Sequence, residues 1–138
     1  MKNTGTLSKF TESTLSLCYL IGNTNGNMTH FETRMYEFIK HKENISEHVA
    51  DLILNEIESM SHKYILERGV RALSQCEKPE QVKCLAWMNK IANADGYLGD
   101  QEWSIIYQVY NKELDITLEE ILDFELPDPD YTFYMSQN

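Results

Sequence analysis

Apolar residues recur at helical spacing through the first half of the chain, in segments separated by short polar turns. A first helix is expected over 6–22, and a second from Thr29, where a Thr-x-x-Glu capping box begins. A similar Asn-x-x-Glu pattern predicts that a third helix starts at Asn44. The buried stripes of the second and third helices are expected to be Phe31, Met35, Phe38 and Ile39, and then Val49, Leu52, Ile53, Ile57 and Met60.

The same periodicity continues through the second half. A fourth helical stretch is expected over 61–75, where Gly69 interrupts the pattern. Pro79 suits the first turn of a broadly apolar fifth helix, which is expected to be central. A sixth helix follows the turn at 93–97, and a short seventh follows a capping box at Thr117. The pattern therefore predicts an all-α, single-domain bundle of about seven helices.

The chain contains an internal repeat. Residues 23–32 match residues 93–102 at an offset of 70, with the Asn, Gly and Glu positions identical and Asn25 where the second copy has Asp95. Each copy is expected to form helix, glycine turn, helix. Two copies predict a pseudo-twofold bundle built on a duplicated helix–turn–helix.

Each turn resembles the second half of an EF-hand calcium loop, in which oxygen ligands recur at fixed places around a glycine. The first place of that loop is normally Asp, but this chain has Ile21 in one copy and Ile91 in the other. An isoleucine removes a primary ligand and belongs to the packed face of the preceding helix. A standard EF-hand is therefore disfavoured.

The second turn and its flanking helices resemble the TerB-like family, named for tellurite-resistance proteins, whose signature is A-D-G-x-[IL]-x-x-x-E. The matching residues run from Ala94 to Glu102, and a weaker copy runs over 24–32. The resemblance covers about 6–124 and implies an all-α bundle with a role in stress response. It also implies a divalent-metal site at Asp95, Glu102 and Glu32.

A structural interpretation of the same residues stands beside the metal interpretation. Asp95 and Gly96 suit a helix end followed by a turn, in which Gly96 takes a positive φ. Glu32 and Glu102 suit the third helical position, where a carboxylate accepts a hydrogen bond from the turn backbone. We favour this interpretation, and keep metal binding as the alternative.

Charge along the chain separates a nearly neutral body from an acidic end. The net charge of the 138 residues is −10, but residues 1–112 carry 14 acids and 12 bases, whereas residues 113–138 carry eight acids and no base. No basic patch is present, so a nucleic-acid partner is not expected. No apolar run is long enough to span a membrane, and the N-terminal residues do not resemble a secretion signal. The three cysteines, Cys18, Cys76 and Cys84, suggest reduced core residues of a cytosolic protein.

The chain is expected to divide into a helical domain over 1–126 and an acidic, aromatic tail over 127–138. Tyr131, Phe133 and Tyr134 stand close together in that tail. Such aromatic residues are expected to bind a partner, to pack back on the bundle, or to pack on a second copy. Dimerisation is left open.

No motif of a catalytic site is present. The leading hypothesis is a non-enzymatic cytosolic protein that binds a protein partner. The rival hypothesis is a protein that binds or senses a divalent metal through Asp95, Glu102 and Glu32. No cofactor other than that divalent cation is suggested by the sequence.

Overall fold

The computed structural model describes residues 8–94, 96 and 98–129, and within them the chain forms helices and no strand. The helices are α1 (Lys9–Gly22), α2 (His30–Lys42), α3 (Glu47–Ile57), α4 (His62–Leu73), α5 (Lys78–Ala92), α6 (Asp100–Tyr107), the π-helix η1 (Gln108–Glu113) and α7 (Leu118–Asp123). This confirms the all-α, single-domain bundle. Among the described residues, no helix is both long and apolar enough to cross a bilayer.

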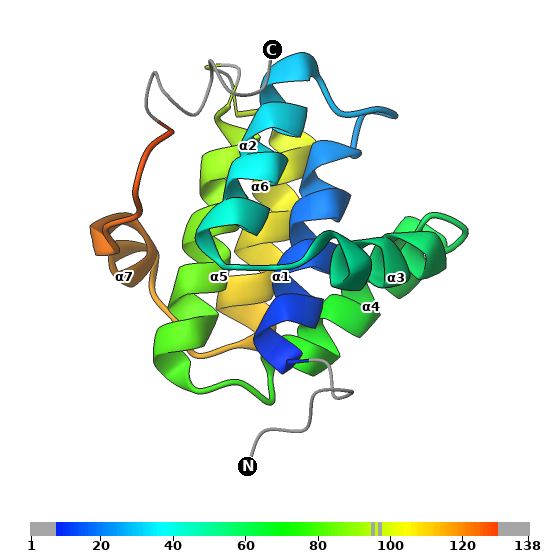
Figure 1. Ribbon diagram of the computed structural model, residues 1–138. Coiled ribbons are helices and arrows are strands. Elements are labelled where there is room, and N and C mark those ends of the chain that lie inside the picture. The colour runs from blue at the N-terminus through cyan, green and yellow to red at the C-terminus, as the bar shows by residue number, and fades with distance from the viewer. Residues whose placement is uncertain (1–7, 95, 97, 130–138) are drawn as a thin grey trace.

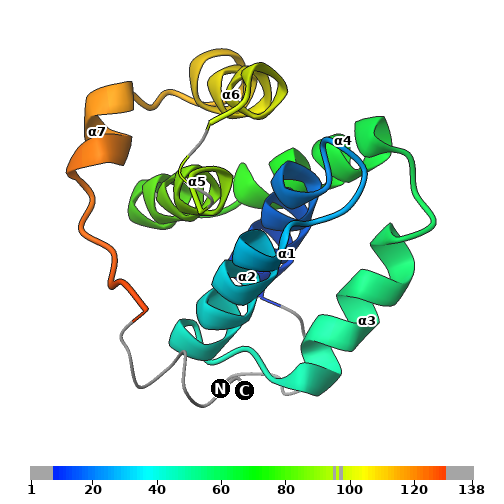
Figure 2. The same cartoon turned by 90° about the horizontal axis from the view of Figure 1, so that it is seen from above.

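Helices α1 and α5 form the centre of the bundle. Figure 2 shows α1 among α2, α3, α4 and α5, with α7 on the outer side of α5. The apolar residues that predicted a central fifth helix are all buried, among them Trp87 at 0% exposure. The indole of Trp87 meets the ring of Phe38 on α2 edge-on, with 6.1 Å between ring centroids. The interpretation of α5 as a central helix is confirmed.

Helix α4 packs closely on α1 through Gly69. A Cβ atom at this position would lie 2.6 Å from both Cγ and Cδ2 of Leu17, which is fully buried. Gly69 therefore does not interrupt α4, which is continuous from His62 to Leu73. The glycine is explained by the closeness of two helices rather than by a break in one.

Two helices start later than the sequence predicted. Helix α1 begins at Lys9, because the Ser8 hydroxyl accepts a hydrogen bond from the amide of Thr11. Helix α3 begins after Ser46, which caps it in the same way, and not at Asn44. Asn44 instead has a left-handed φ of 57°, a conformation that asparagine tolerates better than most residues.

Two residues of the predicted buried stripes face solvent. Phe31 on α2 is 58% exposed and Leu52 on α3 is 55% exposed, so these two predictions were wrong. On α2, Phe38 is buried as predicted, and Tyr36 is a further buried aromatic residue, whose hydroxyl donates to the carbonyl oxygen of Leu15 at 3.0 Å. The buried stripe of α2 thus includes Tyr36 and does not include Phe31.

The two halves of the repeat run in the same direction. In Figure 1, α1 and α5 both rise toward the upper end of the bundle, where each meets its glycine turn, and α2 and α6 return from that end. Residues 70 positions apart have matching burial: Leu15 and Leu85 are fully buried, and so are Ile39 and Val109. The duplicated helix–turn–helix is therefore present in the structure.

A half-buried carboxylate holds α2 against α5. Glu43, at the C-terminal end of α2, accepts hydrogen bonds from Nε1 of Trp87 at 2.8 Å and from Nζ of Lys83 at 3.0 Å. Lys83 also lies over the ring of Phe10, 5.4 Å from its centroid. These contacts fix the spacing of two helices that form walls of the groove described below.

The chain leaves α6 through the π-helix and reaches α7 on the outer side of α5. The predicted capping box at Thr117 is present: its amide donates to Glu120 at 2.9 Å and its hydroxyl accepts from the Glu120 amide at 3.1 Å. Ile116 and Ile121, on either side of the cap, are both buried as a hydrophobic staple requires. Residues 124–129 then continue without helical structure.

Candidate functional site

Each of the two glycine turns holds its glycine at a positive φ. Gly26 has a φ of 112° and Gly96 a φ of 84°, which confirms the positive φ expected for Gly96. The amide of each glycine donates to the carbonyl of the asparagine three residues earlier, at 3.1 and 2.9 Å. That asparagine, Asn23 or Asn93, ends the preceding helix, and its Nδ2 donates to the carbonyl four residues earlier at 2.8 Å in both copies.

The two repeated glutamates cap the helices that follow the turns. Oε1 of Glu32 accepts a hydrogen bond from the amide of Thr29 at 2.8 Å, and Oε1 of Glu102 accepts one from the amide of Gly99 at 2.9 Å. Each glutamate is only 4% exposed. In the first copy the Thr29 hydroxyl also accepts from the Glu32 amide at 3.1 Å, which completes a capping box. The hydrogen bonds expected from the structural interpretation are therefore confirmed for both glutamates.

The residues proposed as metal ligands are only partly placed by the structure. Asp95 lies outside the described residues. Ile21 and Ile91, at the first place of each calcium-like loop, are fully buried in the core. Within the described part of the chain, no group of three or more His, Cys, Asp or Glu residues is arranged to hold a metal ion. Metal binding at Asp95, Glu102 and Glu32 stays a prediction.

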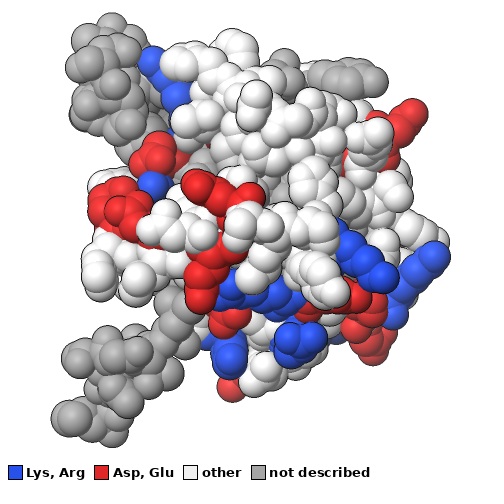
Figure 3. Space-filling model, turned by 90° about the vertical axis from the view of Figure 1, so that its right-hand side faces the viewer, with Lys and Arg blue, Asp and Glu red and all other residues white. Residues whose placement is uncertain are grey.

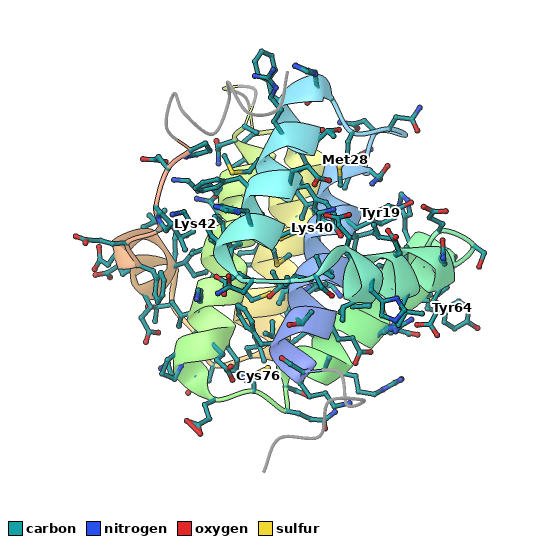
Figure 4. All side chains as sticks on the ribbon, in the orientation of Figure 1. Tyr19, Met28, Lys40, Lys42, Tyr64 and Cys76 are labelled. Atoms are coloured by element: carbon teal, nitrogen blue, oxygen red, sulfur yellow. The ribbon has the colours of Figure 1, made fainter. Side chains whose placement is uncertain are left out.

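The cysteines are free thiols, and none has an activated environment. Burial raises the pKa of Cys84 to about 12, against a smaller lowering by the hydroxyls of Thr14 and Ser13 beside it. Burial also raises the pKa of Cys18 well above its usual value. Cys76 is half-buried near the lower end of the bundle (Figure 4), and burial raises its pKa as well. Thiols with raised pKa values are poor nucleophiles at neutral pH.

A groove lies beside α5, between α2 on one side and α7 with residues 124–129 on the other. It encloses about 750 Å³, and its lining includes Met35 of α2, Asn89 and Lys90 of α5, and Leu122 of α7. Lys90 forms an ion pair with Asp128, which ties the segment after α7 to α5. Leu122 stands at the groove with 60% of its surface exposed.

A smaller hollow of about 380 Å³ occupies the equivalent place in the other half of the repeat. Thr24 and Ile105 line it, and these residues stand 70 positions from Ala94 and Met35, which line the larger groove. Its lining also includes His62 at the start of α4. Helix α4 thus reaches into one of the two related hollows, whereas α7 and the segment after it border the other.

Sequence reasoning missed the groove because its walls come from parts of the chain far apart in sequence. One signal was available: α7 has six residues, and three of them, Leu118, Ile121 and Leu122, are apolar. A two-turn helix on the surface of a bundle buries one face, so an apolar residue left over suggests an exposed contact. The tail aromatics Tyr131, Phe133 and Tyr134 lie outside the described residues.

The predicted resemblance to the TerB-like family rests on the repeated turn, from Asn93 to Glu102 in its second copy. Comparison of the chain with family models, with curated proteins and with solved structures found no match.

Proposed function

We propose that the chain is a non-enzymatic, cytosolic protein of the TerB-like type that binds a protein partner in the groove beside α5. The observation that carries this proposal is the open groove itself, with Leu122 60% exposed beside it. Protein interfaces place a few apolar anchors at their centre and a polar rim around them. The groove supplies both kinds of surface.

The polar residues of the groove support a binding role. Nδ2 of Asn93 donates to the carbonyl oxygen and to Oδ1 of Asn89, at 2.8 and 3.2 Å. Lys90 is engaged with Asp128. These side chains hold one another in place, as a fixed binding surface requires.

The resemblance adds a biological context. The duplicated turn and the all-α bundle agree with what the TerB-like resemblance implies about the fold. A role as an accessory protein in stress response rests on that resemblance alone, and the partner-binding proposal does not depend on it.

Site-specific photo-cross-linking in the host cell tests the proposal. A photoreactive amino acid replaces Leu122 in one variant and Leu52 in another, because Leu52 is a similarly exposed leucine on α3. We expect Leu122 to yield a defined cross-linked protein that Leu52 does not. The captured protein is then purified, and its binding to the native chain is measured by calorimetry, with Leu122→Ser as the disrupting variant.

Two results would contradict the proposal. One is an identical set of cross-links from both positions, which indicates random collisions. The other is a purified candidate that binds the native chain and Leu122→Ser equally well, because the groove would then play no part in the contact.

Divalent-metal binding is the second candidate function. The observation that favours it is the placement of both glycine turns at the same end of the bundle, each with a buried glutamate. The metal titration described in the Discussion separates this candidate from the first.

A further inference from the structure

The groove is bordered by carboxylates that have no basic partner. Residues 113–129 contain seven acids and no base. Glu120 pairs with Lys78 at 3.0 Å, and Asp128 pairs with Lys90. The other five form no ion pair within the described part of the chain. We call the three of them that lie on α7 or line the groove the acidic rim: Glu119, Asp123 and Glu125.

The acidic rim lies next to the exposed apolar surface of α7. Glu119 and Leu122 are three residues apart, so they share one face of the helix. Asp123 follows Leu122 directly, and Glu125 lines the groove itself. An apolar anchor is therefore flanked by negative charge on a single short stretch of chain.

The opposite side of the molecule carries charges of both signs. Figure 3 shows the side that carries α3 and α4, where basic and acidic side chains gather together. Arg68 there pairs with Glu12 at 3.0 Å and with Glu56 at 2.8 Å. The stretch 113–129 thus holds acids without a base, whereas acidic and basic side chains are mixed on the other side.

We infer that the groove takes a basic, amphipathic segment of a partner protein, with an apolar side chain beside Leu122 and Lys or Arg side chains against the acidic rim. This inference rests on the proposed function and adds the class of the partner. Oppositely charged surfaces favour association and exclude partners of like charge. Nucleic acid would be repelled by the rim, and a second copy of this chain carries a net charge of −10.

The chain's own C-terminal residues are a poorer occupant on the same grounds. Residues 130–138 contain one acid and no base, so they offer no charge to the acidic rim. Their aromatic residues, Tyr131, Phe133 and Tyr134, supply apolar surface only. The experiment below includes this occupant as a distinct outcome.

A fluorescent peptide of leucine and lysine at helical spacing is the probe, and a peptide with glutamate in place of lysine is its control. Binding to the full chain is measured by fluorescence anisotropy at low and high salt. We expect the basic peptide to bind, the acidic peptide not to bind, and the affinity to fall as salt screens the rim. Leu122→Ser should weaken binding by roughly tenfold, because the complex then loses the burial of one apolar side chain.

Matched variants test where the charge acts. The first carries Glu119→Gln, Asp123→Asn and Glu125→Gln in the acidic rim. The second carries Asp51→Asn, Glu58→Gln and Glu67→Gln, three exposed acids on or next to α3 and α4. Both variants change the net charge by the same amount, so only the rim variant should lose affinity. If both variants lose the same amount of affinity, the peptide is attracted by the overall charge of the protein, and the inference is overturned.

Two further outcomes would also overturn it. Replacement of all three tail aromatics by serine in the full chain would raise the peptide affinity strongly if the tail occupies the groove. Cross-linking from Leu122 to a partner without a basic segment at the contact would refute the partner class while leaving the proposed function intact. If no partner is captured in cells, it is the proposed function that fails, whatever the peptide does.

Discussion

Glu32 and Glu102 stand 70 positions apart in the chain, and each accepts the same hydrogen bond, from the amide three residues earlier, at 2.8 and 2.9 Å. Both side chains are buried to the same extent. An amide at the start of a helix has no partner within the helix, so it needs an acceptor elsewhere. The shared glutamate of the repeat is thereby explained without any bound ligand.

Removal of either carboxylate should therefore destabilise the fold. We expect Glu32→Ala and Glu102→Ala each to lower the free energy of unfolding by about 1–2 kcal/mol, because each leaves an amide at the start of a helix without its acceptor. Urea denaturation measures the change. Glu32→Gln and Glu102→Gln, which keep an acceptor oxygen, should recover most of the loss. A full loss in the glutamine variants would show that charge, and not the hydrogen bond, is what matters.

Gly96→Val should destabilise the protein through its backbone alone. The φ of 84° at this residue disfavours side chains, and a Cβ there would meet no atom within 4 Å. The expected cost is about 1–3 kcal/mol of unfolding free energy, with a smaller cost for Gly96→Asn, because asparagine tolerates the left-handed region. Thermal melts of both variants check the order. An unchanged melting temperature for Gly96→Val would refute the assignment.

Gly69→Ala should destabilise the contact between α1 and α4. Alanine favours a helix over glycine by about 1 kcal/mol, but the new Cβ would lie 2.6 Å from Leu17, and overpacking costs about 1–3 kcal/mol. We expect the clash to prevail. In a Leu17→Ala background the clash disappears, so Gly69→Ala should then be neutral or stabilising. Chemical denaturation of the four proteins tests this, and additive effects would contradict the close contact.

Alkaline pH should weaken the fold through its buried thiols. The folded pKa of Cys84 is raised by burial from 9.0 to about 12, so the unfolded chain loses this proton first. The contribution of each such thiol to the free energy of unfolding is therefore fully present below pH 9. Above pH 9 it falls by about 1.4 kcal/mol per pH unit. Denaturation at pH 8, 9 and 10 measures the slope. Cys84→Ala should flatten it more than Cys76→Ala does, because Cys76 is only half-buried; equal slopes would contradict this origin.

Divalent ions should add little stability. Millimolar calcium, magnesium, manganese or zinc is expected to leave the melting temperature nearly unchanged, because Glu32 and Glu102 are engaged by backbone amides. A metal present at about 100 times its dissociation constant would instead stabilise the fold by about 2.7 kcal/mol. A clear rise in melting temperature that Asp95→Asn abolishes would replace the capping interpretation by the metal-binding one.

Short patterns in the sequence correctly predicted the structural features that depend on residues close together in the chain. The capping boxes at Thr29 and Thr117 and the central position of α5 follow from short patterns, and all three are present. Where two possible N-cap residues lie within a few positions of each other, the pattern predicts the start of the helix less well. Ser46 caps α3, although the same spacing favoured Asn44, because the chain needs a left-handed residue between α2 and α3 and Asn44 supplies it.

What the sequence could not predict depends on how helices face one another. Periodicity finds an apolar stripe but does not fix its limits, so Phe31 and Leu52 were placed inside although solvent reaches them. The groove needs residues from α2, α5 and α7 together, and Met35 and Leu122 lie 87 positions apart on its walls. Such a site follows only from the packed arrangement.

The π-helix between α6 and α7 coincides with one additional residue in the second copy relative to the first. Up to Val109, equivalent residues of the two copies are 70 apart, but after Gln108–Glu113 the offset becomes 71. Ile45 then corresponds to Ile116, both buried before a helix, and the cap Ser46 corresponds to the cap Thr117. A π-turn holds one more residue than an α-turn in the same length of helix. Helices α3 and α7 thus follow the two copies at corresponding positions, and the shorter of them, α7, borders the groove.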